Sequence, residues 1–238
     1  MKRFYNEAAV DIGDGGHRIL LDGKPMRTPA KAVLVVPTRA LAEAIATEWR
    51  AVPAGAELNV SHLALTRLAA TGLDRVTLQR ESVVEDTAKY AGSDMLCYRA
   101  REPESLVKRQ QVTWQPLLDR AAERYGARLL VVDGLAFVEQ PADAVARLRA
   151  AVAAHGNLAL SALYNLTHIS GSLVIALAVA DGHLAADDAF AAAQLDELYQ
   201  VQRWGEDPTS TLRHANIRRD IAACAHFLVL LEDQRLKG

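Results

Sequence analysis

Residues 32–49 read AVLVVPTRALAEAIATEW and change from a strand pattern to a helix pattern at Pro37. The first part is a β-branched run, and the proline ends it because proline has no N–H to donate to a neighbouring strand. Thr38 is a good helix N-cap. Apolar side chains then recur every four positions, as on one face of a helix: Leu41, Ile45 and Trp49. This stretch therefore predicts a strand and then a helix over residues 39–49, whose apolar face packs on a sheet.

Upstream of Pro37, turn residues separate short apolar runs. The sequence DIGDGG at residues 11–16 and the pair Asp22-Gly23 supply glycines that favour hairpin turns. Pro25 restricts the residues around it to an edge or short strand. We therefore expect residues 1–37 to form an antiparallel sheet.

From residue 73 onward helical patterns dominate. The exception is residues 128–138, where two apolar runs flank a hairpin signal, Asp133-Gly134. The sequence therefore predicts a small α+β domain at residues 1–70, with an antiparallel sheet and a packed helix. A larger, mainly α-helical domain with one short β-hairpin is expected at residues 71–238.

Within the helical part, residues 157–180 are the most apolar and are expected to form a helical region with a kink near Gly171. Two further helices are expected at residues 187–204 and 208–236. Gly205 lies between them and is expected in the left-handed conformation that ends many helices.

Composition excludes several classes of protein. The chain has 238 residues, of which 50% are apolar and 24% charged, and its formal net charge is -2. A disordered chain would have fewer apolar residues and a larger net charge. A dedicated nucleic-acid-binding protein would carry a basic excess. The longest apolar runs have about a dozen residues, fewer than the ~20 that span a bilayer. We therefore expect a soluble, helix-rich protein that neither binds nucleic acid nor inserts into membranes.

Two features predict the compartment. Cys97 and Cys224 are far apart and form no CxxC pattern, so we expect two reduced, buried thiols. The N-terminal sequence MKRFYNEAAV lacks the apolar core of a signal peptide and the Arg- and Ser-rich character of a transit peptide. Both features are typical of a bacterial cytoplasmic protein.

Motifs for catalysis are weak. GDGG at residues 13–16 fits neither a dinucleotide-binding fingerprint nor a phosphate-binding loop. The 7 histidines include no HExxH or HxxxH pair, so neither a metal nor a cofactor is expected. His168 lies in an apolar segment beside Ser170 and Ser172 and is the candidate general base, although a buried structural histidine is the simpler interpretation. The chain is therefore not expected to be an enzyme.

The 3 tryptophans lie in largely polar surroundings. Tryptophan and arginine are enriched at the energetic centres of protein interfaces, because they bury a large area and keep a polar group. Trp204 precedes Gly205 at the end of an expected helix and has charged neighbours, so it is a candidate for recognising a partner. Helix packing is the interpretation for Trp114 and the alternative one for Trp49.

Several short segments, in order along the chain, resemble one family. The most specific is LDELYQVQRWGE at residues 195–206. The others are RFY at 3–5, LLDGKPMRTP at 20–29, LAEAIATEW at 41–49, LTR at 65–67 and DMLCYR at 94–99. In these features the chain is similar to the assembly chaperones of the ATP synthase F1 α subunit, the type of mitochondrial F1-ATPase assembly factor 2, and it resembles a bacterial member. Tyr5 stands where that family usually has tryptophan, and Ala64 where it usually has proline.

The resemblance implies a chaperone that is not an enzyme and requires no nucleotide. It would bind the free α subunit and shield the surface that later packs against β, until the α/β ring forms. An orphan ring subunit exposes a large apolar interface, which is an aggregation hazard.

The resemblance assigns partner binding to residues from two segments: Glu48 and Trp49, and then Glu197, Gln200, Arg203, Trp204, Gly205 and Glu206. Trp204 would be the anchor, and Glu197 and Glu206 would complement charge on the α subunit. Helical spacing predicts that Glu197, Gln200 and Trp204 share one face.

Two other classes of function are open alternatives. One is a small-molecule hydrolase or transferase that uses His168 in a pocket of the helical domain. The other is a structural homo-oligomer with Trp204 at the interface between copies, whereas the chaperone is expected to be monomeric alone.

Overall fold

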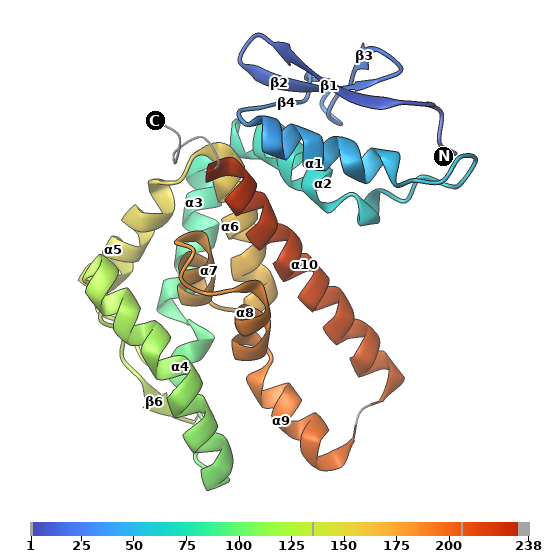
Figure 1. The fold of residues 1–238 in the computed structure, drawn as a ribbon. Coiled ribbons are helices and arrows are strands. Elements are labelled where there is room, and N and C mark those ends of the chain that lie inside the picture. Colours follow the sequence, from blue (N-terminus) through green and yellow to red (C-terminus); the bar gives the residue numbers. More distant parts are fainter. Residues whose placement is uncertain (1, 135, 206, 233–238) are drawn as a thin grey trace. The chain divides into compact units, whose positions relative to one another are not determined.

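A computed structural model describes residues 2–134, 136–205 and 207–232 (Figure 1). The chain forms two compact units. Unit 1 consists of Met1–Arg80, Asn157–Ala162 and His226–Gly238, and unit 2 of Glu81–Gly156 and Leu163–Ala225. Within the described ranges, no helix is both long and apolar enough to span a bilayer.

Unit 1 contains an antiparallel sheet built from β1 (Ala8–Gly13), β2 (Gly16–Leu21), β3 (Lys24–Pro25) and β4 (Val35–Val36). β1 and β2 form a hairpin, and β3 and β4 both pair with β2. The hairpin turn is tight because Gly15 and Gly16 adopt φ angles of 84° and 144°, which glycine tolerates without a steric penalty. The predicted antiparallel sheet is confirmed.

α1 (Arg39–Arg50) lies along β1 and β2 (Figure 1), as the change of pattern at Pro37 predicts. The Thr38 hydroxyl accepts a hydrogen bond from the Leu41 N–H at 3.2 Å and is the N-cap. The same hydroxyl donates to the Leu230 carbonyl at 2.7 Å, a contact within unit 1 that joins the N-terminus of α1 to the last turns of α10 (Pro208–Glu232). The predicted stripe of Leu41, Ile45 and Trp49 is buried. Each such side chain stabilises the fold by about 1.5–3 kcal/mol.

α2 (Ala64–Thr71) continues into a π-helical segment, Gly72–Val76, and packs closely on the first turns of α6 (Asn157–Ser170). The Ser161 hydroxyl donates to the Leu68 carbonyl at 2.9 Å. A Cβ atom on Gly72 would lie only 3.0 Å from the Leu158 Cα. A side chain at residue 72 would therefore push these two helices apart.

Unit 2 is mainly helical and contains most of α6 and α10 besides α3 (Arg80–Ala88), α4 (Glu104–Tyr125), α5 (Ala142–Ala153), α7 (Leu173–Ala180), α8 (Ala186–Ala193) and α9 (Leu195–Trp204). Every residue of α7 is buried, so this helix forms the centre of the core. Trp114 on α4 is also buried, and its Nε1–H donates to the Ala192 carbonyl at 2.9 Å. Cys97 and Cys224 are buried and form no disulfide bond, as expected.

Local details of unit 2 differ from the sequence expectations. In place of the hairpin expected at residues 128–138, β6 (Val132–Asp133) pairs in parallel with β5 (Tyr98–Arg99). Gly171, with a φ of 69°, separates α6 from α7, so residues 157–180 form two helices. Gln194, with φ -107° and ψ 17°, likewise divides the helix expected at residues 187–204 into α8 and α9.

Candidate partner-binding surface

α9 carries the segment to which the sequence analysis assigns partner binding. The helix buries Leu195 and Tyr199. Gln200, Arg203 and Trp204 are exposed, and Trp204 leaves 75% of its surface in solvent. Because tryptophan is highly buried on average, an indole this exposed is a candidate contact for another protein.

Gly205 ends α9 with φ 88° and ψ 167°, and its N–H donates to the Val201 carbonyl at 2.9 Å. The positive φ is one that glycine adopts easily. The predicted left-handed helical conformation is wrong, because the ψ angle is extended and the chain leaves the helix at once. Glu206, the next predicted residue, lies outside the described residues.

Glu197 contacts α10. Its carboxylate forms an ion pair with Arg213 and lies 3.1 Å from Nε2 of His214. The residues expected on one face of α9 therefore have different surroundings: Glu197 holds α9 against α10, whereas Gln200 and Trp204 are exposed. A charge reversal at Glu197 would weaken this packing as well as change the surface.

Sequence reasoning missed the cluster around Tyr199. The guanidinium carbons of Arg109 on α4 and Arg203 on α9 each lie 5.3 Å from the centroid of its ring. The Tyr199 hydroxyl is 2.6 Å from Oγ of Ser105, and Arg109 donates to Oε1 of Gln202 at 2.8 Å. The spacing of Tyr199 and Arg203 by one helical turn was visible in the sequence, but the contribution of α4 was not.

Trp49, the other predicted tryptophan, is buried in unit 1 with 8% of its surface exposed. Its Nε1–H donates to Oγ1 of Thr66 at 3.0 Å, and the Tyr5 hydroxyl donates to the Trp49 carbonyl at 2.6 Å. The rings of Tyr5 and Trp49 are 5.4 Å apart between centroids. Through these contacts Trp49 packs the N-terminal segment, α1 and α2 together, which is a structural role.

The Glu48 side chain caps the N-terminus of α2. Its carboxylate accepts hydrogen bonds from the Leu65 N–H at 2.7 Å, the Thr66 N–H at 2.9 Å and the Thr66 hydroxyl at 2.8 Å. It thereby replaces a side-chain cap, which Leu63 at the N-cap position does not provide. Burial raises the pKa of Glu48 above its ordinary value, and the hydrogen bonds oppose that rise.

Replacing Glu48 with alanine is expected to lower the free energy of unfolding by about 1–2 kcal/mol, because α2 loses its capping carboxylate. Glu43→Ala is the matched control: Glu43 lies on the same helix and pairs with Arg50 at 3.1 Å, both side chains being more than 40% exposed. That exposed pair is expected to contribute less than about 1 kcal/mol. Urea denaturation followed by circular dichroism measures both variants. Equal effects would contradict the capping role.

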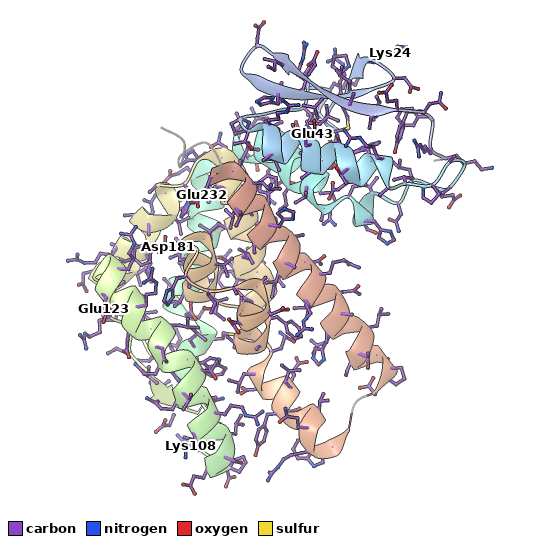
Figure 2. All side chains as sticks on the ribbon, viewed as in Figure 1. Lys24, Glu43, Lys108, Glu123, Asp181 and Glu232 are labelled. Carbon is purple, nitrogen blue, oxygen red and sulfur yellow. The ribbon has the colours of Figure 1, made fainter. Side chains whose placement is uncertain are left out.

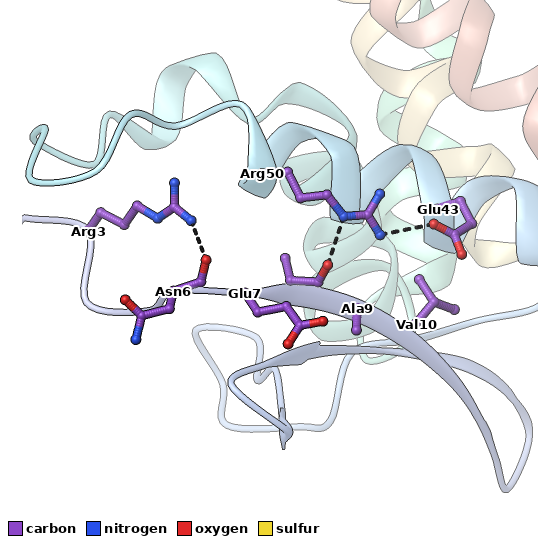
Figure 3. A pocket seen from close by; sticks show the side chains of 8 residues that line it. Arg3, Asn6, Glu7, Ala9, Val10, Glu43 and Arg50 are labelled. Carbon is purple, nitrogen blue, oxygen red and sulfur yellow. Dashed lines mark hydrogen bonds and ion pairs between the residues drawn. The ribbon is translucent and has the colours of Figure 1, made fainter.

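Described residues of unit 1 line two pockets of similar size. One, of about 540 Å³, lies beside β1 and is lined by residues that include Arg3, Glu7, Glu43 and Arg50 (Figure 3). Two of its charged groups are engaged locally: Arg50 pairs with Glu43 and donates to the Ala8 carbonyl at 2.7 Å. The other, of about 590 Å³, is lined by Glu48, His62 and His226 among others. Glu48 is already held there by α2.

The surroundings of His168 differ from both sequence interpretations of it. The side chain is exposed on α6, with Nδ1 2.9 Å from the Tyr164 carbonyl and the rings of Tyr90 and Tyr164 within 5.0 Å. The hydroxyls of Ser170 and Ser172 are engaged with the main chain, Ser172 as the N-cap of α7. In the described ranges, no group of three or more His, Cys, Asp or Glu residues is placed to hold a metal ion.

Comparisons with known proteins agree on one relationship. The sequence profile of the family described as ATP12 chaperone protein matches residues 2–122. The solved structure of Atp12 from Paracoccus denitrificans is 36% identical, covers 97% of this chain and 98% of its own, and superposes with a TM-score of 0.90. A solved protein from Agrobacterium tumefaciens is 40% identical over 97% of this chain and 86% of its own, with a TM-score of 0.91. The mitochondrial protein atp12 of Schizosaccharomyces pombe is 23% identical over 249 positions, which span 100% of this chain and 85% of that protein.

The fold and these relationships define the class of the molecule as an assembly chaperone. The chain belongs to the ATP12 chaperone family, a family of ATP synthase assembly factors. The resemblance inferred from the sequence motifs is therefore confirmed, and with it the class of chaperone in place of enzyme.

Proposed function

We propose that this protein binds the free α subunit of the ATP synthase F1 sector and shields its β-facing surface until the α/β ring forms, without nucleotide and in the bacterial cytoplasm. The main support for this proposal is the exposure of Trp204, which leaves 75% of its surface in solvent at the end of α9. Family membership makes a subunit of the synthase the natural client.

A releasable shield requires a contact of moderate strength. An aromatic anchor with a polar rim provides this, because a few central side chains contribute most of the binding energy of an interface. Gln200 and Arg203 supply polar groups next to Trp204. The helix that presents them is packed through the buried side chains Leu195 and Tyr199, so little conformational entropy is lost on binding.

The test is aggregation of purified α subunit, followed by light scattering. A stoichiometric amount of the chaperone is expected to suppress it in the absence of ATP, and added β subunit is expected to displace the chaperone. Unchanged aggregation of α would overturn the proposal. Light scattering of the chaperone alone tests the alternative that it is a homo-oligomer. A measured mass of 25.8 kDa, that of a monomer, would exclude this alternative.

Replacing Trp204 with alanine is expected to weaken binding of the α subunit about 10–100-fold, as loss of a central aromatic anchor does. Because the side chain is exposed, the free energy of unfolding should change by less than about 0.5 kcal/mol. Phe137→Ala is the matched control, since Phe137 is an aromatic residue of unit 2 that is also 75% exposed. Titration calorimetry measures both variants, and equal losses would show that Trp204 is not a specific anchor.

A further inference from the structure

Two arginines from different helices converge on one buried ring in unit 2. Arg109 and Arg203 approach the Tyr199 ring equally closely, with their guanidinium carbons 5.3 Å from its centroid. Tyr199 is only 6% exposed, and its hydroxyl contacts Ser105 at 2.6 Å, so the ring is a fixed support. The two guanidinium groups are therefore held no farther apart than twice that distance, with cation–π attraction orienting each of them.

No carboxylate among the described residues lies within ion-pair distance of either guanidinium group. Arg109 has a neutral acceptor, Gln202. The acidic residues of α9 are used elsewhere: Asp196 accepts from Nε2 of Gln110 at 2.8 Å, and Glu197 pairs with Arg213. Among the described residues, no carboxylate therefore offsets the repulsion between these two like charges.

We propose that Arg109 and Arg203 form a receptor for an acidic side chain of the client, an inference that rests on the proposed binding of the α subunit. A guanidinium group presents a planar fork of donors that matches a carboxylate, and two such groups make an incoming carboxylate favourable at this place. Charge complementarity favours a carboxylate as the group bound between the two arginines. Nucleic-acid phosphates would require a broad basic surface, whereas the chain carries a net charge of -2.

Apolar side chains lie next to the arginines in the sequence of both helices. Trp204 directly follows Arg203, and Val112, which is 67% exposed, follows Arg109 by one helical turn on α4. Val112 shares a face of α4 with Arg109, so the client segment that fits is an acidic residue with an apolar neighbour. The carboxylate would supply orientation and rate of association, and the apolar contacts most of the affinity.

The closing experiment measures binding of purified α subunit by the full chain at several salt concentrations. The double variant Arg109→Gln, Arg203→Gln is expected to bind at least tenfold more weakly, to associate more slowly and to lose much of the salt dependence. Lys108→Gln is the matched control, because Lys108 is exposed on the same helix (Figure 2) and makes no ring contact with Tyr199 among the described contacts. It should bind within about twofold of the wild type, since a single rim charge changes affinity little.

A second arm identifies the client carboxylate. Exposed Asp and Glu residues of the α subunit are replaced one at a time by asparagine or glutamine, and each variant is measured against wild-type chaperone and the double glutamine variant. One replacement should weaken binding to the wild type and have no further effect on the double variant. If the wild type does not bind α, both the proposed function and the receptor are overturned. If it binds and the double variant retains its affinity and salt dependence, the receptor alone is overturned.

Discussion

Replacing Trp49 with alanine is expected to lower the free energy of unfolding by about 3–5 kcal/mol, the usual effect of truncating a large buried aromatic residue. The indole is 8% exposed and contacts elements on both sides of α1. Its removal leaves a cavity between the N-terminal segment and α2, takes the indole donor away from Thr66, and deprives the Tyr5 ring of its neighbour. Because domains are stable by only about 5–15 kcal/mol, this change should remove a large share of the stability of unit 1.

Urea denaturation followed by circular dichroism measures the change. Trp49→Phe keeps most of the apolar volume but loses part of the ring and the hydrogen bond to Thr66, so it should cost clearly less than Trp49→Ala. Trp204→Ala serves as the exposed control, with little expected change. A Trp49→Ala variant that keeps its stability within about 1 kcal/mol but no longer binds the α subunit would show that Trp49 is a binding residue.

The second large effect is a dependence of stability on pH that comes from Asp94. Its carboxyl group is fully buried between the turn Met95–Cys97 and the N-terminus of α7, where it accepts the Leu96 N–H at 3.1 Å and the Val174 N–H at 3.0 Å. Burial raises the pKa of Asp94 to about 6, although the hydrogen bonds from Val174, Ser172 and Leu96 oppose the rise. The folded protein therefore binds this proton more tightly than the unfolded chain.

The sign of the effect follows from that difference. The stabilisation from protonated Asp94 is fully present below the unfolded pKa near 3.8 and is lost as the pH rises through about 6. Relative to Asp94→Asn, which cannot titrate, the wild type should lose up to about 3 kcal/mol of unfolding free energy between pH 4 and pH 7. Urea denaturation of both proteins across this range measures it. Parallel stability curves would show that Asp94 has the same pKa in both states.

The elements that depend on neighbouring residues could be predicted well from the sequence. The end of the strand at Pro37, the cap at Thr38 and the buried stripe of α1 depend on contacts within about one helical turn, and all are present. The pairing of β5 with β6 could not be predicted. Two-residue strands have no measurable period, and the partner of Val132 is Tyr98, more than thirty positions away.

The candidate site shows the same division. Sequence patterns singled out α9, where Trp204 is exposed. Sequence patterns did not separate Trp204 from Trp49, because the partner of the Trp49 indole is Thr66 on α2. They also did not reveal that Glu197, whose side chain is 40% exposed, pairs with Arg213 on α10.

The sequence by itself determined the family and the antiparallel sheet with its packed helix, because motif order and hydrophobic period are properties of the linear chain. For the same reason it identified the segment ending in Trp204 and Gly205 as the candidate for partner binding. The tertiary structure decided which polar and aromatic groups are already occupied. It brings Arg109 from α4 to Tyr199 on α9, and Glu48 from α1 to the N-terminus of α2. Such pairings arise from packing between segments distant in sequence, where burial makes an unpartnered polar group costly, and no local pattern records them.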